Sequence, residues 1–301
     1  HKDKEFSKFI HDFKDKLSWV QLCANEAFNT THAIRHIDTI QHSDILLKNI
    51  ASNRSIDWRQ LNLDHDVIFT VGSRSPSICV QDILTSIIDG NSPLQWDFDE
   101  VSKSPAILME DVDKHPDLPW CYSTMSCNPN LTEEFVERHL DKPWNYVQLS
   151  GHDNISFAFI QKHALPYDNW LVSCNSNLTI ELIEHHIKMG HKFDPNGLSL
   201  NPNLTWDAMK RIDDHTRIVW NMYVVSKHIP LTETIVRDNF DTLREGILHN
   251  PTLTKASIME HLVKIKSIYK HKYWLSKHPS MKHCDLISVD VFDPSGWSLN
   301  P

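Results

Sequence analysis

The residues of this sequence best suited to chemistry are histidines that recur at a regular spacing. His139, His163 and His186 follow one another at intervals of 24 and 23 residues, and His261 occupies the equivalent place further along. A neutral imidazole can bind zinc or exchange protons near neutral pH. One zinc ion needs three or four ligand atoms at about 2.0–2.3 Å from the metal. The first question is therefore whether these rings can converge.

The spacing argues against a shared metal ion. If these histidines lie on stacked helical repeats, neighbouring helices are separated by about 8–10 Å and the rings lie too far apart to bind one ion. Each histidine also falls near the end expected for its helix, where a ring N–H can donate to the last carbonyl groups. We predict no metal, catalytic or cofactor-binding residue and no cofactor. A metal-binding or enzymatic protein that uses the repeated histidines is the alternative from a different class.

The six cysteines favour a reducing compartment and no disulfide framework, since they are sparse for a chain of 301 residues. Cys23, Cys127 and Cys174 fall at or beside a repeated serine position, so we interpret them as small buried residues. The sequence contains no GxGxxG, GxxxxGK[ST], HExxH or GxSxG motif. The motifs therefore favour a protein that is not an enzyme.

Composition excludes further classes of function. Only 7 of the 301 residues are glycine, whereas phosphate-binding loops need glycine at fixed places. The formal net charge of −9 disfavours nucleic acid as a partner. No apolar run reaches the roughly 18 residues that a membrane span requires, and the charged start at residues 1–5 has no apolar segment of a signal peptide. We expect an intracellular protein that is not secreted and binds neither membranes nor nucleic acid.

An internal repeat is the strongest pattern in the chain. Residues 193–202 and 292–301 are identical at eight of ten positions, and their core recurs as Leu-Ser-x-Asn-Pro-x-Leu-Thr. The clearest copies of this motif are 125–132, 149–156, 172–179, 198–205, 225–232 and 247–254. Neighbouring serine positions are 21 to 30 residues apart, with a mean of 25. Because 25 residues bury too little apolar surface to fold alone, the copies are expected to stack on one another.

The residues after each motif predict a helix. Apolar residues recur three, four, seven and eight positions after the final Thr or Ser, which is the spacing of one helix face. The predicted N-cap residues are Thr132, Ser156, Thr179, Thr205, Thr232 and Thr254. We interpret Asn-Pro as a turn, and Gly197 and Gly296 as one type of turn. The tryptophans expected to pack between repeats are Trp120, Trp144, Trp170, Trp220 and Trp274.

The predicted fold is therefore all-α. We expect an elongated α-solenoid of about twelve repeats of roughly 25 residues, each with a short helical turn, an Asn-Pro turn and a helix of two to three turns. Residues 1–48 are expected to form an N-terminal capping helix and a degenerate repeat. The helical repeat array then covers residues 49–301, and its last repeat is truncated.

The pattern W-x-x-L-S-x-N-P-N-L-T, with Asp-Lys-Pro-Trp at 141–144, resembles the tandem-repeat proteins of giant nucleocytoplasmic large DNA viruses, most strongly over 96–301. The resemblance implies a viral origin and an interaction or structural role, and it carries over no catalytic residues. We therefore expect a scaffold for protein–protein interaction with viral or host partners. It is expected in the host cytoplasm or in the virion. The alternative is a structural component of the virion, such as a minor capsid or inner-layer protein.

Overall fold

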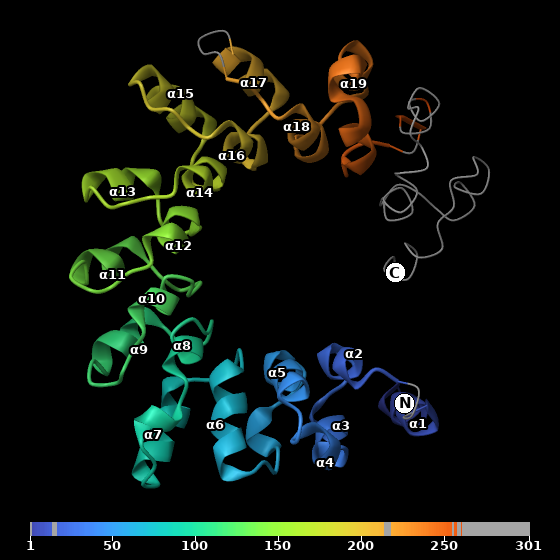
Figure 1. Cartoon of the computed structure of the whole chain (residues 1–301), viewed down its shortest axis with the longest axis vertical. Coiled ribbons are helices and arrows are strands. Elements are labelled where there is room, and N and C mark those ends of the chain that lie inside the picture. The colour runs from blue at the N-terminus through green and yellow to red at the C-terminus, as the bar shows by residue number, and fades with distance from the viewer. Residues whose placement is uncertain (1, 14–16, 214–217, 255, 258–259, 261–301) are drawn as a thin grey trace. The chain divides into compact units, whose positions relative to one another are not determined.

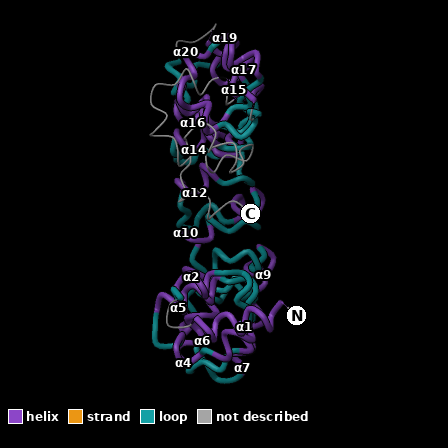
Figure 2. Tube along the Cα trace, turned by 90° about the vertical axis from the view of Figure 1, so that its right-hand side faces the viewer, coloured by secondary structure: helices purple, strands orange, loops and turns teal. Residues whose placement is uncertain are grey.

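The computed structural model describes residues 2–13, 17–213, 218–254, 256, 257 and 260. These residues form twenty α-helices and three short 3₁₀ helices, and the described part of the chain contains no strand (Figure 2). The prediction of an all-α protein is thus confirmed. No helix among the described residues is both long enough and apolar enough to cross a membrane. The chain separates into two compact units, residues 1–154 and residues 155–301, which we call the N-terminal and C-terminal units.

The N-terminal unit contains fourteen of these helices, which follow one another along the chain (Figure 1). They are α1 (Lys2–Phe13), α2 (Trp19–Ala24), α3 (Thr30–Arg35), α4 (Ile37–Ile40), α5 (Asp44–Ser52), η1 (Trp58–Gln60), α6 (His65–Arg74), α7 (Val80–Ile88), η2 (Pro93–Gln95), α8 (Phe98–Val101), α9 (Met109–Lys114), α10 (Tyr122–Met125), α11 (Glu133–Arg138) and α12 (Tyr146–Gly151). Here α2 packs against α5, α5 against α6, α6 against α8 and α8 against α10.

The C-terminal unit continues the same alternation of short helices and turns. Its helices are α13 (Phe157–Lys162), α14 (Asn169–Cys174), α15 (Ile180–Lys188), α16 (Pro195–Leu200), α17 (Trp206–Asp213), α18 (Met222–His228), α19 (Glu233–Asp238), α20 (Phe240–Leu243) and η3 (Arg244–His249). Helix α14 packs against α16, α16 against α18 and α18 against η3. In both units, helices of successive copies therefore contact one another in chain order.

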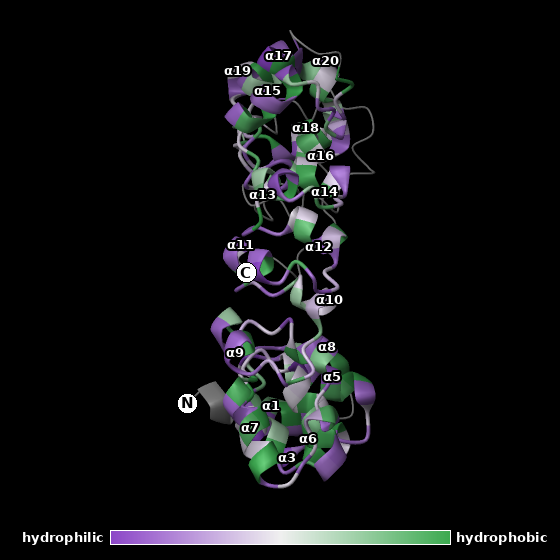
Figure 3. Cartoon of the chain, turned by 90° about the vertical axis from the view of Figure 1, so that its left-hand side faces the viewer, coloured by the Kyte–Doolittle hydropathy of each residue, from purple (hydrophilic) through white to green (hydrophobic). Residues whose placement is uncertain are grey.

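All six predicted N-caps are present. The side-chain oxygen of each residue accepts a hydrogen bond from the backbone N–H three residues later, over 3.1–3.4 Å. The helices that follow the caps have 6 residues in α11, α13 and α19 and 8 or 9 residues in α17 and α15. Several of these helices are therefore shorter than the predicted two to three turns. Helix α11 carries hydrophobic and hydrophilic residues together (Figure 3), and its buried side chains are Phe135 and Val136.

The asparagine of the motif joins each copy to the preceding one. In the N-terminal unit, Asn128 Nδ2 donates to the carbonyl oxygens of Ser102, Ser104 and Ile107 over 2.9–3.2 Å. Its Oδ1 accepts the N–H of Asn130 at 2.8 Å, which shapes the turn itself. We call this set of side chains the asparagine ladder, and its members are Asn53, Asn128, Asn175, Asn201 and Asn250.

The same donor pattern recurs in the other copies. Asn201 reaches three carbonyls of the preceding copy over 3.0–3.2 Å, and Asn53 does so over 2.9–3.1 Å. All five ladder asparagines are buried, with at most 6% of their surface exposed. The prediction of an Asn-Pro turn was therefore incomplete. The residue shapes its own turn, and its buried amide also satisfies carbonyls that lie 20 to 30 residues earlier in the chain.

The repeated serines form a second set of contacts between copies. Ser126 Oγ donates to Tyr122 O within its own helix and accepts the N–H of Asn145 from the next copy at 3.0 Å. Ser173 makes the equivalent pair of bonds, and its Oγ accepts the N–H of Asp194 at 2.9 Å. A small hydroxyl at this position thus satisfies a backbone donor of its neighbour, which explains why serine recurs.

Gly197 is not part of a turn, contrary to the prediction, because it lies inside α16. An added Cβ would lie 2.5 Å from Trp170 O and 2.7 Å from Ser173 Cβ of α14, so only glycine allows the two helices to approach this closely. Gly246, four residues before Asn250 just as Gly197 precedes Asn201, meets α18 in the same way through Ser226. Gly296 lies outside the described residues.

Of the tryptophans predicted to pack between repeats, three are buried and one is exposed. Trp120, Trp144 and Trp220 are buried, and the indole N–H groups of the first two donate to carbonyl oxygens five residues earlier at 2.8 Å. Trp170, however, is 42% exposed. The buried tryptophans lie six residues before the repeated serine, whereas Trp170 lies only three residues before Ser173. Trp274 lies outside the described residues.

Candidate functional site

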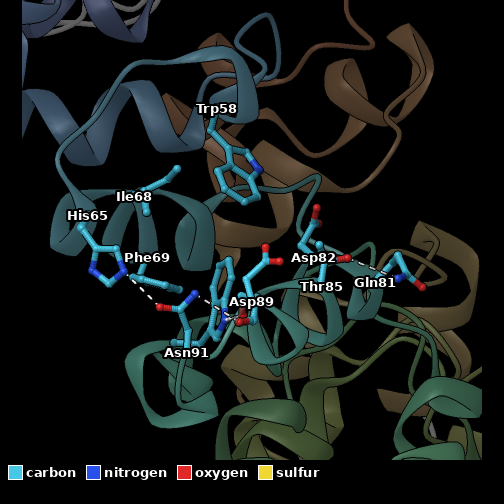
Figure 4. Close-up of a pocket in the computed structure, with 11 residues that line it drawn as sticks. Trp58, His65, Ile68, Phe69, Gln81, Asp82, Thr85, Asp89 and Asn91 are labelled. Carbon is cyan, nitrogen blue, oxygen red and sulfur yellow. Dashed lines mark hydrogen bonds between the residues drawn. The ribbon is translucent and has the colours of Figure 1, made fainter.

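A pocket in the N-terminal unit is the candidate binding site. It has a volume of about 300 Å³ and is bounded mainly by α6 and α7. Figure 4 shows His65, Ile68 and Phe69 on one side of the space and Asp82, Thr85 and Gln81 on the other. Trp58 and Trp96 complete the walls. We call this space the aromatic pocket.

Three aromatic rings that contact one another form a wall of the pocket. The rings of Trp58 and Trp96 meet edge to face with centroids 5.9 Å apart, and Phe69 meets Trp96 in the same way at 5.0 Å. Gly72 of α6 lies directly behind the two tryptophans. A Cβ on Gly72 would lie 2.8 Å from Trp96 Cζ3 and 3.0 Å from Trp58 Cζ3, so glycine is needed for this packing.

Hydrogen bonds fix the position of the Trp96 wall. The Trp96 indole N–H donates to Ser86 Oγ at 2.9 Å. Gly90, with φ of +90°, ends α7 and allows Asn91 N–H to donate back to Ser86 O at 3.0 Å. This turn places the Asn91 side chain at the pocket, where its Oδ1 lies 3.0 Å from His65 Nε2. The pocket is thus preformed by α6, α7 and the turn that follows α7.

The charged groups at the pocket differ in whether they are paired. Arg59 and Asp82 form two parallel contacts, at 2.7 Å and 2.6 Å. Burial raises the pKa of the Asp82 carboxyl, but hydrogen bonds from Arg59 and Cys79 outweigh this and bring the pKa below its usual value. The Arg59 guanidinium also lies over the Trp58 ring at 4.9 Å. Asp89, in contrast, is exposed, and its carboxylate has no ion pair among the described residues.

This arrangement is suited to binding a ligand or a partner side chain. Aromatic walls with a few polar groups at the rim are typical of pockets that hold an apolar or amphipathic side chain or ligand. The lining residues include no cysteine and no Ser–His pair for which a hydrogen bond is observed. His65 contacts Asn91 and the Phe69 ring.

The repeated histidines lie on separate helices. Along residues 2–13, 17–213 and 218–254, no group of three or more His, Cys, Asp or Glu side chains is placed to hold a metal ion. His139 and His163 are the C-cap residues of α11 and α13, and His186 lies in the last turn of α15, so all three lie at the helix ends where they were expected. His139 Nε2 lies 2.9 Å from Asp113 Oδ1 and so contacts a carboxylate instead of the predicted carbonyl. His261 lies outside the described residues.

His186 instead belongs to an aromatic cluster in the C-terminal unit. Its ring lies 5.0 Å from Phe157 and 6.4 Å from His191, and His191 packs against Phe193 at 4.3 Å. Burial lowers the pKa of both histidines, and a neighbouring histidine lowers each further, His185 in the case of His186 and His186 in the case of His191. Both rings therefore favour the neutral form.

The cysteine prediction is correct for one of three residues. Cys23 is fully buried, and burial raises the pKa of its thiol to about 11. Cys127 is exposed and Cys174 is partly exposed, because each follows the buried serine of its copy by one residue and so faces outward. The five cysteines of the described part are free thiols, and Cys284 lies outside it.

Comparison of the chain with family models, with curated proteins and with solved structures finds no match. The aromatic pocket was not predicted from the sequence, because Trp58 and Trp96 are 38 residues apart and only the fold brings them together. The signal that could have found it is Gly72, a rare glycine next to the repeated serine position in a helix.

Proposed function

We propose that this protein is a non-enzymatic helical-repeat scaffold that binds other proteins. In this proposal about twelve repeats of roughly 25 residues stack into one α-solenoid, with residues 1–48 as its N-terminal cap and residues 49–301 as the array. A solenoid presents an extended surface built from short units, which suits it to binding proteins.

The asparagine ladder is the observation that carries this proposal. The motif residues are occupied by contacts between copies, since the ladder asparagines donate to the preceding copy and the serines accept from the next. The features that differ among copies are instead exposed side chains.

Exposed apolar side chains at non-repeated positions provide the surface for partners. Ile88 is 81% exposed, Leu94 78% and Met189 75%. Ile88 and Leu94 flank the turn that closes the aromatic pocket, so one region of the N-terminal unit offers both a hollow and apolar side chains next to it. Apolar groups of this kind contribute most to binding when a partner buries them.

The proposed partners are viral or host proteins, and the proposed location is the host cytoplasm or the virion. This part of the proposal rests on the resemblance of the repeat motif to tandem-repeat proteins of giant viruses. The net charge of −9 fits protein partners better than nucleic acid.

The test has two parts. The first is size-exclusion chromatography, under native conditions, of an extract from cells that contain the protein. The second is cross-linking in the same cells. We expect light scattering across the eluted peak to give a mass well above the 35.0 kDa of the chain, and the chain to cross-link reproducibly to the same partner. The double variant Ile88→Asp with Leu94→Asp tests the surface near the pocket and is expected to lose the cross-link, whereas Ala158→Asp, at an exposed position of α13, is its matched control and should keep it. A chain that elutes as the monomer without any partner, and that yields no cross-links, would contradict the proposal.

A further inference from the structure

The asparagine ladder has a gap in the N-terminal unit. Ser75 ends α6 with φ of −71° and ψ of 133°, nearly the backbone conformation with which Asn53 ends α5, at −79° and 112°. It therefore occupies a ladder position with a shorter side chain. Its hydroxyl reaches only Ser77, whose N–H and Oγ lie 3.3 Å and 3.0 Å away. Ser104 occupies the next ladder position, so two successive copies lack the amide.

The gap leaves a backbone acceptor without its usual donor. Asn53, Asn128, Asn175 and Asn201 each donate to the carbonyl three residues after the ladder position of the preceding copy, as Phe28 O receives Asn53 and Ile107 O receives Asn128. Ile56 holds this place in the copy before Ser75. Among the described residues, no group donates to Ile56 O. Ile56 itself is 5% exposed, so the acceptor belongs to a largely buried residue.

A hollow of about 370 Å³ lies at this gap. Its lining residues are Arg54, Ile56, Ser75, Pro76, Ser77 and Pro105, which come from the turns of three successive copies. Between the copies with Asn175 and Asn201, where the ladder is complete, the equivalent carbonyls accept a further asparagine side chain, as Ser176 O and Leu178 O accept Asn203. Arg54 is exposed, and its guanidinium has no ion pair among the described residues.

We propose that this hollow, which we call the ladder gap, binds a primary carboxamide, the side chain of an asparagine or glutamine on an extended segment of a protein partner. The amide NH₂ donates to Ile56 O, and the amide oxygen accepts from Arg54. The partner thereby supplies the group that the copies with Ser75 and Ser104 lack. The proposal rests on the proposed function in that the ligand belongs to a protein.

The chemistry of the lining distinguishes the carboxamide from charged groups. An ammonium group could donate to Ile56 O but would be repelled by Arg54. A carboxylate could pair with Arg54 but has no donor for Ile56 O, which would remain unsatisfied. A carboxamide carries both a donor and an acceptor and fits both partners.

The test is an NMR titration of the full chain with two blocked tripeptides, Gly-Asn-Gly and Gly-Asp-Gly. We expect the asparagine peptide to shift the backbone amide signals of residues around Ile56, Ser75 and Ser77, and the aspartate peptide to bind at least tenfold more weakly. Equal affinity for the two peptides, or no shift at these residues, overturns the proposal. The titration does not depend on any cellular partner, so its failure is distinguishable from failure of the proposed function.

A variant of the chain itself tests the same proposal, because it fills the ladder gap with a side chain of the protein. Ser75→Asn places the missing amide on the chain itself and is expected to weaken binding of the asparagine peptide at least tenfold while raising the melting temperature. Ser52→Asn makes the same chemical change at an exposed position of α5 and is expected to leave both unchanged. Undiminished binding of the asparagine peptide by Ser75→Asn would contradict the assignment.

Discussion

Ala164 is the single non-glycine residue with a positive φ in the described part of the chain, at +48°. It follows α13, where Leu165 N–H donates to Ile160 O and Ala164 N–H to Gln161 O. The same pattern of backbone hydrogen bonds ends α7 and α15, but there the residue with positive φ is glycine. Ala164 is therefore a site of backbone strain that a glycine would remove.

Replacing this residue should stabilise the protein. We expect Ala164→Gly to raise the free energy of unfolding by about 0.5–1 kcal/mol, because glycine adopts a positive φ without a steric cost. The matched control is Ala158→Gly, which changes an exposed residue within α13 and should lower stability by about 0.5–1 kcal/mol. Chemical denaturation of both variants measures the effects, and a loss of stability in Ala164→Gly would argue against the strain.

The aromatic cluster around His191 predicts how stability depends on pH. Its pKa in the folded protein is lower than the value of about 6.5 in an unfolded chain. The unfolded state therefore takes up protons first as the pH falls, so the stability contributed by the neutral ring is complete above pH 6.5 and is lost below it. The pKa of His186 is lowered as well, so this residue loses its contribution in the same direction as the pH falls.

The variant His191→Phe keeps an aromatic ring in the cluster but removes one proton-binding site. We expect the wild-type protein to lose more stability than this variant between pH 7.5 and 5.5, as measured by thermal unfolding at a series of pH values. Parallel losses in the two proteins would show that His191 does not contribute to the pH dependence.

At the scale of the elements, the ladder explains how such short helices stay in place. A helix of four to six residues is unstable alone because the first turn is costly to form. Each ladder asparagine satisfies up to three carbonyls of the preceding copy, so the turns hold the helices in register. His152 occupies the ladder position of a copy without asparagine, and its Nε2 lies 2.9 Å from Asn128 O. A different side chain thus fills the same role there.

Removing one ladder amide should be costly. We expect Asn128→Ala to lower the free energy of unfolding by about 2–4 kcal/mol, because three buried carbonyls lose their donor. Asn128→Asp keeps the shape but removes the NH₂ group, and it should destabilise at least as much. Asn62→Ala, at an exposed position of the same unit, should change stability by less than about 0.5 kcal/mol. Similar effects of Asn128→Ala and Asn62→Ala would contradict the ladder.

The caps and the ladder also show what could be predicted from the sequence. Thr132 and its equivalents were predicted correctly, because capping depends on residues within one helical turn. The role of Asn128 was missed, since its acceptors lie 21 to 26 residues earlier and only the fold brings them together. The aromatic pocket depends in the same way on Gly72, which allows two distant tryptophans to meet.

At the scale of the whole molecule, we propose that all copies stack into one array. The described helices pack in chain order within each unit, from α2 to α10 and from α14 to η3. Twelve stacked repeats would make an elongated protein, whereas a compact globular chain of this length has a radius of gyration of about 19 Å.

Small-angle X-ray scattering of the purified monomer tests this central claim most directly. The account predicts a folded protein with a radius of gyration well above ~19 Å and a skewed distance distribution typical of an elongated particle. A radius of gyration near ~19 Å with a symmetric distance distribution would show a compact globule and contradict the repeat array.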